Sequence, residues 1–239
     1  TTVTYTVNVP DAIATKAIGD GHSGVTKLIY EVYREAQLAD LSAAPIYEGE
    51  AEINADGVAT LSLEFVKDQN FTVLFWAQNP LASVYTTDDL RNVQLAQTLT
   101  ANNVNTAVFA GSDKVDNCVS AANGAVDLVR PIAQLRIGTT PESLDIRSTH
   151  VTLKKSDLKV KGLSTTYNVA TEAAGADKSE FTYSVAAVPE ETFKANNVDY
   201  QYVAMSYVGF ASDLGANIDV EFNINTSEGV ISHEVVNVP

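Results

Sequence analysis

The sequence is poor in the residues that build disulfides and zinc sites. It has one cysteine, Cys118, so no disulfide can form within the chain. Its three histidines, His22, His150 and His233, lie far apart, and none belongs to a pair with metal-ligand spacing. A structural zinc ion needs three or four nitrogen or sulfur ligands, so the composition predicts no metal site and no cofactor. No stretch approaches the roughly 18 apolar residues of a membrane-spanning helix.

Positive charge is also scarce. The 239 residues include 15 lysines and arginines against 30 aspartates and glutamates, a formal net charge of −15. Nucleic acid and anionic lipid would repel such a chain, so neither is a predicted partner. The composition is 45% hydrophobic and 19% charged, which is typical of a globular protein. The sequence shows no signal-peptide pattern at its start and begins inside the strand-like pattern TVTYTVNV, so we expect it to represent a processed, mature form.

What the sequence does contain is alternation with a period of two, the pattern of half-buried strands. In TVTYTVNV, the residues Val3, Tyr5, Val7 and Val9 share one face, and polar residues occupy the other. The same alternation recurs in VATLSLEF (58–65) and NIDVEFNI (217–224). Two further runs are apolar on both faces and predict fully covered central strands: FTVLFWAQ (71–78) and YQYVAMSYVGF (200–210).

Turn signals separate these runs, and helix signals are short. NADG (54–57) and NTSEG (225–229) each predict a hairpin turn, because asparagine, aspartate and glycine tolerate positive φ. TTDDLRNVQL (86–95) predicts a helix of one or two turns, with a threonine cap and aspartates near its start. TPESLDIR (140–147) predicts another, with proline in its first turn.

The number of strands indicates the fold class. About a dozen short strands at close spacing predict an all-β protein built of antiparallel sandwiches with few short helices. The length fits two sandwich domains better than one. We place the boundary in GTTPESLDIR (138–147), which gives an N-terminal domain over residues 1–145 and a C-terminal domain over 146–239.

One segment, IATKAIGDGHSG (13–24), is similar to the strings in which serine hydrolases present their nucleophile. A nucleophile elbow has the form Gly-x-Ser-x-Gly, but Ser23 is followed by Gly24 and then by Val25, where the second glycine belongs. The general base would have to be His150 or His233, each in a strand-like run. The segment is therefore interpreted as a glycine-rich loop, and no catalytic residue is predicted.

For the other candidate residues, a structural role fits the sequence better than a functional role. Asp88 and Asp89 fit an exposed acidic turn better than a calcium site, because no loop carries alternating oxygen ligands. Trp76 fits the core, and Arg130 before Pro131 fits a solvated charge on an edge strand. Several tyrosines fit either a sandwich core or a sugar-stacking platform, and both readings stay open: Tyr30, Tyr33, Tyr47, Tyr85, Tyr200, Tyr202 and Tyr207.

Several strings together resemble a known family. VTYTVNVPDAIATKAIGDG, LIYEVYRE, FTVLFWAQN, LVRPIAQLRIGTT and VVNVP are similar to segments of the fimbrillin-like proteins of Bacteroidales, relatives of the type V pilins. The resemblance covers nearly the whole chain in the expected order, and FWAQN and RPIAQLRIGTT are its most specific parts. The resemblance implies two tandem transthyretin-like β-sandwich domains, without catalytic activity, in a lipoprotein exported to the outer membrane and cell surface.

The resemblance also implies a mechanism of assembly. In polymerising members, a trypsin-like protease cuts the loop after the first strand, and a terminal strand of the next subunit fills the groove that opens. The matching residues here are Lys16 and Ala17 for the cut, although relatives often carry arginine at this point. Val3, Tyr5, Val7 and Val9 are the inward face of the assembly strand. The family usually continues past NVP with one more strand segment, whereas this sequence stops at Pro239.

The physics of the first strand agrees with such a mechanism. Burial of four large apolar side chains contributes about 6–12 kcal/mol gross, which is comparable to the net stability of a whole domain. We therefore expect a non-enzymatic fimbrial subunit or adhesin, with other pilin subunits and a host protein or glycan receptor as partners. The alternative is a carbohydrate-binding surface lipoprotein of similar architecture. An enzyme ranks third and needs a polar cleft that joins Ser23 to His150 or His233.

Overall fold

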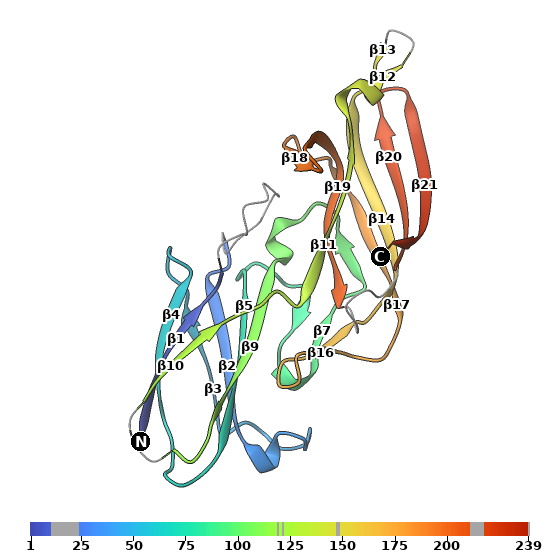
Figure 1. The fold of residues 1–239 in the computed structure, drawn as a ribbon. Helices are drawn as coiled ribbons and strands as arrows, with labels where there is room; N and C mark the ends of the chain where they lie inside the picture. Colours follow the sequence, from blue (N-terminus) through green and yellow to red (C-terminus); the bar gives the residue numbers. More distant parts are fainter. Residues whose placement is uncertain (11–23, 119, 121, 147–148, 211–217, 239) are drawn as a thin grey trace.

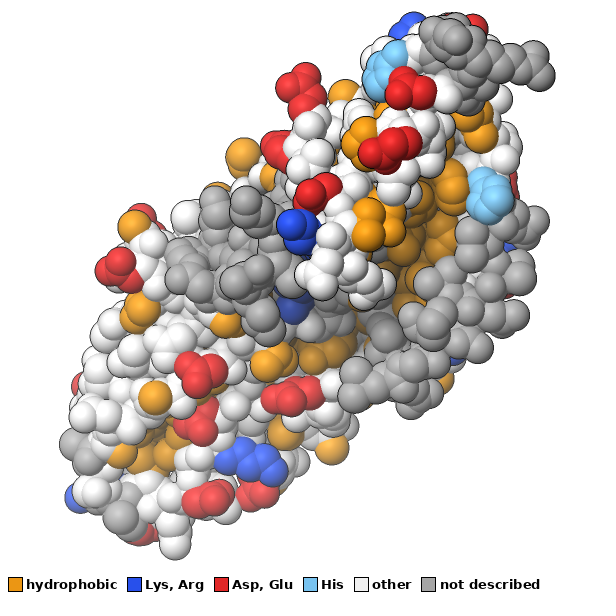
Figure 2. Space-filling model, turned by 45° about the horizontal axis from the view of Figure 1, so that its top comes forward, with side chains coloured by type: hydrophobic (Ala, Val, Ile, Leu, Met, Phe, Trp, Pro, Cys, Tyr) orange, Lys and Arg blue, Asp and Glu red, His pale blue; other side chains and the backbone are white. Residues whose placement is uncertain are grey.

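The structure is a computed structural model that describes residues 1–10, 24–118, 120, 122–146, 149–210 and 218–238. Figure 1 shows an elongated molecule made almost entirely of strands, with the N-terminus at one end. Acidic side chains spread over the face drawn in Figure 2, in keeping with the net charge of −15. The prediction of an all-β protein with antiparallel sheets and few short helices is confirmed; the transthyretin-like topology stays a prediction.

Two sheets form the half of the molecule that contains the N-terminus (Figure 1). The first sheet has the order β10-β1-β4, and the second has the order β3-β2-β5-β9. Their strands are β1 (Thr2–Asn8), β2 (Lys27–Arg34), β3 (Tyr47–Glu52), β4 (Val58–Glu64), β5 (Phe71–Gln78), β9 (Val108–Val115) and β10 (Ala122–Asp127). All neighbours are antiparallel except β1 and β10, which run parallel.

Two further sheets form the other half. A five-stranded sheet has the order β21-β20-β14-β17-β8, and a three-stranded sheet has the order β11-β19-β18. Their strands are β8 (Thr98–Thr100), β11 (Ile132–Thr139), β14 (Leu153–Leu163), β17 (Ser179–Ala187), β18 (Thr192–Ala195), β19 (Val198–Phe210), β20 (Ile218–Thr226) and β21 (Gly229–Val238). Strands β8 and β11 thus pair with strands from much later in the sequence.

A small sheet joins the two halves. Its order is β16-β15-β7-β6, with β6 (Tyr85–Thr86), β7 (Val93–Leu95), β15 (Thr166–Asn168) and β16 (Ala173–Ala174). A short hairpin pairs β12 (Asp145–Ile146) with β13 (Thr149–His150). Because backbone pairing links β7 to β15 and β8 to β17, segments on both sides of residue 145 share sheets. The division into domains at this residue stays a prediction.

The described helices are single 3₁₀ turns: η1 (Glu35–Gln37), η2 (Leu90–Asn92), η3 (Val104–Thr106) and η4 (Pro141–Leu144). The helix expected over 140–147 is present as η4, with Pro141 in its first position. Of the one or two helical turns expected over 86–95, a single 3₁₀ turn, η2, is present, and its cap is Asp89 rather than a threonine. The Asp89 carboxylate accepts from the Arg91 N–H and caps η2, and the β-branched Val93 then starts strand β7.

The two predicted hairpin turns have different outcomes. NTSEG joins β20 to β21 with Thr226 opposite Gly229, as predicted. NADG forms the predicted turn, with Gly57 at φ +75° and Asn54 Oδ1 accepting from the N–H groups of Asp56 and Val58. However, the strands on either side, β3 and β4, belong to different sheets. The turn is therefore a corner between two layers rather than the end of a ladder.

Strand β5 lies at the centre of the core, and all eight of its residues are buried. One face of its sheet packs on the β10-β1-β4 sheet, where the rings of Tyr5 and Phe75 meet at 5.4 Å. The other face carries Trp76, whose ring contacts Tyr85, Tyr167 and Phe210. These partners come from the small joining sheet and from β19. Burial on both faces explains why FTVLFWAQ shows no alternation, and the prediction that Trp76 belongs to the core is confirmed.

Candidate assembly groove

Strand β1 occupies the middle of its three-stranded sheet. It pairs along its whole length with β4 on one edge, from Thr2 opposite Glu64 to Asn8 opposite Val58. On the other edge it pairs with β10, from Val3 opposite Ala122 to Asn8 opposite Asp127. A strand paired on both edges satisfies its own backbone and that of two neighbours. Its removal would leave a slot one strand wide between β4 and β10.

The inward face of β1 is the one that alternation predicted. Val3, Tyr5, Val7 and Val9 are each at most 3% exposed, and they belong to the main hydrophobic core. The residues between them, Thr4, Thr6 and Asn8, are exposed or half-buried. This face lies over the β3-β2-β5-β9 sheet, and the Tyr5 ring meets Phe75 edge-on with an interplanar angle of 62°. The burial of the four side chains is thus established, whereas their part in assembly stays a prediction.

Both ends of β1 are fastened by hydrogen bonds. The Thr1 amino group donates to the Phe65 carbonyl at 2.8 Å, and the Phe65 N–H donates back to the Thr1 carbonyl at 2.7 Å. At the other end, the Val9 N–H donates to the Gly57 carbonyl at 2.8 Å. Asn8 Nδ2 also donates to the Asp127 carboxylate at 2.8 Å. The strand is therefore held in one register.

The predicted processing residues Lys16 and Ala17 lie outside the described residues, as do His22 and Ser23 of the hydrolase-like string. The other two histidines lie on the surface. His150 Nδ1 is 2.8 Å from the Asp145 carboxylate in the β12-β13 hairpin. The ring of His233 packs on Phe222, which is directly opposite on β20. Neither contact links a histidine to a serine.

A buried charged cluster lies behind β2. Glu31 of β2 is 2% exposed, and its carboxylate accepts from the Tyr33 hydroxyl and from the Leu90 N–H, both at 2.9 Å. Burial raises the pKa of the Glu31 carboxyl above its ordinary value. Arg91 lies next to this pair and bonds both oxygens of Asp89. It also donates to four carbonyl oxygens of the loop after β2, those of Gln37, Asp40, Leu41 and Ala43.

That cluster corrects one reading of the sequence. Asp89, considered for an exposed acidic turn with Asp88, is instead the N-cap of η2 and the ion-pair partner of the buried Arg91. The arrangement fastens a loop and leaves the guanidinium fully engaged. Among the described residues, no group of three or more histidine, cysteine, aspartate or glutamate side chains could hold a metal ion.

The sequence left open whether the tyrosines line the core or form a sugar-stacking surface, and the structure divides them between buried and more exposed positions. Tyr33, Tyr85, Tyr202 and Tyr207 are at most 8% exposed and line the core. Tyr47 is exposed on β3, whereas Tyr30 and Tyr200 are half-buried on β2 and β19. The exposed and half-buried tyrosines therefore come from three different strands.

Arg130 requires a correction. It was expected to be a solvated charge at a strand edge, but it is half-buried and lies over two rings. The guanidinium carbon is 5.0 Å from the ring centre of Phe109 and 5.1 Å from that of Tyr207. Because Phe109 belongs to β9 and Tyr207 to β19, Arg130 joins the two halves of the molecule.

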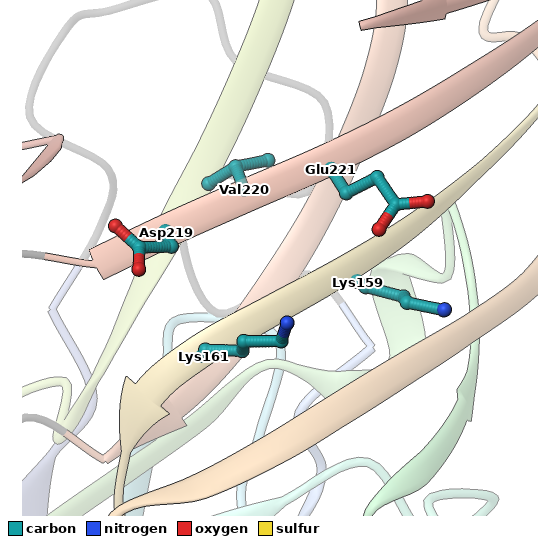
Figure 3. Close-up of a pocket in the computed structure, with 5 residues that line it drawn as sticks. All are labelled: Lys159, Lys161, Asp219, Val220 and Glu221. Carbon is teal, nitrogen blue, oxygen red and sulfur yellow. The ribbon is translucent and has the colours of Figure 1, made fainter. Parts of the chain in front are cut away.

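The surface has shallow hollows. Figure 3 shows one on the outward side of β14 and β20, where Lys159 lies opposite Glu221 and Lys161 opposite Asp219. This hollow is a ladder of opposite charges between neighbouring strands. A wider, polar hollow of about 580 Å³ lies where η1 and the turns after β4 and β9 meet; its lining includes Arg34, Glu35, Asp68, Asn70 and Asn117.

The half of the molecule that contains β14 and β19 is unevenly covered, because a three-stranded sheet faces a five-stranded one. On the edge strand β21, Ile231 shares a face with the buried Ile224 yet is 48% exposed. Figure 2 shows apolar side chains in a hollow in this half of the molecule. In the described part of the chain, no helix combines the length and apolar character that crossing a bilayer requires.

Comparison with known structures places this fold. A candidate adhesin from Bacteroides ovatus superposes with a TM-score of 0.54 at 15% identity, over 97% of this chain and 75% of that one. A candidate adhesin from Bacteroides thetaiotaomicron gives 0.53 at 11%, over 100% and 79%. A candidate polysaccharide-binding protein from the same species gives 0.55 at 11%, over 98% and 80%. The chain thus has the β-sandwich fold of these Bacteroides proteins.

That shared fold confirms, at the level of architecture, the resemblance found in the sequence. The chain belongs to a family of unknown function, DUF6562, whose model matches residues 1–239. No curated protein matches the chain.

Sequence reasoning missed two features of these sites. Gly124 of β10, which lies against Tyr5, was not singled out, although a glycine inside a strand often marks a close approach of neighbouring groups. The Glu31–Arg91 cluster was also missed. Its signal was one acid inside the apolar run LIYEVY, because a buried carboxylate requires partners.

Proposed function

We propose that this chain is a non-enzymatic subunit of a cell-surface fimbria or adhesin that assembles by strand exchange. Cleavage after Lys16 frees β1, and a strand of a second subunit takes its place between β4 and β10. The precursor is exported and anchored at the outer membrane by a lipid. The partners are other subunits and a host protein or glycan receptor.

One observation carries this proposal. The first strand of the sequence is also the middle strand of a sheet, paired on both edges and buried through four apolar side chains. A single cut in the segment between β1 and β2 would separate it from every later strand. The chain left behind would expose an apolar slot and two unpaired edges, which another strand can satisfy by β-augmentation. Until the cut, β1 blocks that slot.

Limited proteolysis tests the mechanism. We expect a trypsin-like protease to cut the folded chain after Lys16, so that Ala17 becomes the new N-terminus, and the cut protein to form oligomers on size-exclusion chromatography. Lys16→Gln should stay uncut and monomeric, whereas Lys67→Gln, in the exposed turn after β4, should behave like the parent chain. A cut protein that stays monomeric at high concentration, with its groove emptied of β1, would refute assembly by strand exchange.

A second candidate function is carbohydrate binding. The polar hollow of about 580 Å³ favours it, because arginine, carboxylate and amide side chains hydrogen-bond sugar hydroxyls. The fold is shared with a candidate polysaccharide-binding protein. A glycan array tests this function: binding that Asn70→Ala or Asn117→Ala abolishes, while Asn54→Ala in a distant exposed turn does not, would establish the hollow as the site. No binding on the array would remove this candidate.

A further inference from the structure

The ring of Tyr5 fills a space that a glycine leaves open. In the parallel pairing of β1 with β10, Tyr5 lies directly opposite Gly124. A Cβ atom placed on Gly124 would lie 2.6 Å and 2.7 Å from two ring carbons of Tyr5, closer than such atoms approach in real proteins. The backbone of Gly124 does not have positive φ, so conformation does not require glycine here. The requirement is space for the ring.

The neighbouring positions of the slot differ from this one. Val3 lies opposite Ala122 and Val7 opposite Val126, so β10 presents a side chain at both places. Of the three inward residues of β1 that pair with β10, Tyr5 alone faces a glycine. The slot is therefore widest at its middle, and a one-step slip of register would bring a different residue there.

The space is shaped for a ring rather than for a hydroxyl. On its other side, the Tyr5 ring meets Phe75 of β5, with 5.4 Å between the ring centres. The side chain is fully buried, and its hydroxyl makes no hydrogen bond of good geometry within the described part of the chain; burial first, and then the nearby carboxylate of Asp113, raise the pKa of this hydroxyl. Such a poorly bonded, buried hydroxyl contributes little that is favourable, whereas the ring contributes apolar area and an aromatic contact.

We propose that the groove between β4 and β10 selects its strand by an aromatic side chain at the position of Tyr5, and that Gly124 is the residue that sets this preference. The inference rests on the proposed strand exchange and adds to it the chemistry of the partner. The incoming strand carries phenylalanine or tyrosine at the central inward position and β-branched or smaller residues two places before and after. The aromatic residue fixes the register at which the strand docks.

Peptide exchange into the cut protein tests this preference. A site-specific protease sequence inserted after Lys16 lets the full chain be cut while β1 stays bound. The cut protein is then mixed with fluorescent peptides of sequence 1–10, and exchange is followed by anisotropy. We expect the Tyr5→Phe peptide to bind within about threefold of the native peptide, and the Tyr5→Ala peptide to bind at least about 100-fold more weakly. The Val7→Ala peptide, which removes less apolar area, should lose about tenfold.

A change in the groove gives the reciprocal test. In the Gly124→Ala protein, the native peptide should bind at least about 30-fold more weakly, while the Tyr5→Ala peptide should lose less than about threefold. Ala125→Val, at the exposed neighbouring position of β10, should leave the whole peptide series unchanged. The peptide series in the parent groove decides the question even where Gly124→Ala does not fold.

The outcomes separate the two proposals. If the native peptide does not enter the groove, strand exchange itself is wrong. If the native peptide enters but the Tyr5→Ala peptide binds as well as the Val7→Ala peptide, strand exchange stands and the aromatic preference is overturned. If the Gly124→Ala protein loses affinity for the native peptide and for the Tyr5→Ala peptide by the same factor, the role assigned to Gly124 is also overturned.

Discussion

The guanidinium carbon of Arg91 lies 4.1 Å from the ring centre of Tyr33. Arg91 comes from η2 and Tyr33 from β2, and the Tyr33 hydroxyl in turn donates to Glu31. The arginine side chain is 2% exposed, and it donates hydrogen bonds to Asp89 and to carbonyl oxygens of the loop over residues 37–43. One side chain thus holds a loop, a 3₁₀ turn and the back of a sheet together.

Arg91→Ala should lower the free energy of unfolding by about 3–5 kcal/mol, because it leaves Asp89 without its ion-pair partner and several carbonyl groups of the loop without donors. Arg91→Lys should still lower it by about 2 kcal/mol, because one ammonium cannot reproduce the planar fork of five donors. Urea denaturation measures both. Arg34→Lys, an exposed arginine bonded to Gln69, is the matched control and should change stability by about 0.5 kcal/mol or less. Equal stability of Arg91→Lys and the parent would contradict this account.

Asp177 should give the protein an acid-sensitive component of stability. Its carboxylate accepts from the hydroxyls of Ser164, Thr165 and Ser179, and these bonds, that of Ser164 first, lower its pKa from 3.8 to about 2. The folded state releases this proton more readily than the unfolded state. The contribution is therefore complete above pH 3.8 and is lost as pH falls toward 2.

Asp177→Asn should accordingly cost about 1 kcal/mol at pH 7, because solvent screens this exposed site. The difference from the parent should shrink as the pH falls from 4 to 2 in a series of urea titrations. Asp56→Asn, in the exposed corner turn, is the control. A difference that stays constant over this range would show that the carboxylate charge plays no part.

Glu31 should show the opposite pH dependence. Burial raises its pKa above the ordinary 4.5, although the bonds from Leu90 and Tyr33 and the charge of Arg91 oppose the shift and that of Asp89 adds to it. The folded state then binds the proton more tightly than the unfolded state. Stability from this residue therefore rises as pH falls through the raised pKa and levels off below 4.5.

Glu31→Gln keeps an oxygen acceptor for the Leu90 N–H and removes the titration. At pH 7 the variant should lie within about 1 kcal/mol of the parent, because the loss of a buried charge offsets weaker hydrogen bonds. Relative to the variant, the parent should become more stable as the pH is lowered toward 4.5 in thermal unfolding. A parent that loses stability relative to Glu31→Gln over that interval would reverse the assigned sign.

Asn102 should contribute strongly to stability, because it links the two sheets that contain β17 and β19. It has φ +59°, and its side chain accepts from the Met205 N–H and donates to the Ala187 carbonyl, both at 2.7 Å. It therefore bonds β19 in one sheet and β17 in the other. Asn102→Ala should cost about 2–4 kcal/mol, from a strained backbone and a buried N–H without a partner.

Two variants separate those causes. Asn102→Gly relieves the backbone and should recover about 1 kcal/mol of the loss. Asn196→Ala, at an exposed turn position with φ +49°, should cost about 1 kcal/mol, which is the contribution of backbone strain alone. Chemical denaturation ranks all three. A cost for Asn102→Ala no larger than that for Asn196→Ala would mean that the two bonds contribute nothing measurable.

Strand content was predictable where periodicity is strong. Alternation in TVTYTVNV correctly assigned Val3, Tyr5 and Val7 to the core, and the unbroken apolar run over 71–78 correctly indicated a strand covered on both faces. The run over 86–95 misled because its polar start suits either a helix cap or a loop. Asp89 resolved that ambiguity only through Arg91, whose partners lie some 50 positions earlier in the sequence.

Only one side of the groove could be predicted from the sequence. The inward residues of β1 follow from the sequence, but Gly124 becomes significant only when β10 lies beside β1, 119 positions away. The same holds for the NADG turn. Its residues specify a tight reversal, but the layer in which each flanking strand pairs depends on partners elsewhere in the chain.

By itself, the sequence determined that this protein is built of strands, which face of most strands is buried, and which family pattern it resembles. These properties depend on side-chain periodicity and local turn chemistry, which neighbouring residues set. The tertiary structure decided which strands pair, why Arg130 lies between two rings, and why a glycine faces Tyr5. Those features depend on close packing between distant segments, and packing is settled only when the whole core is assembled.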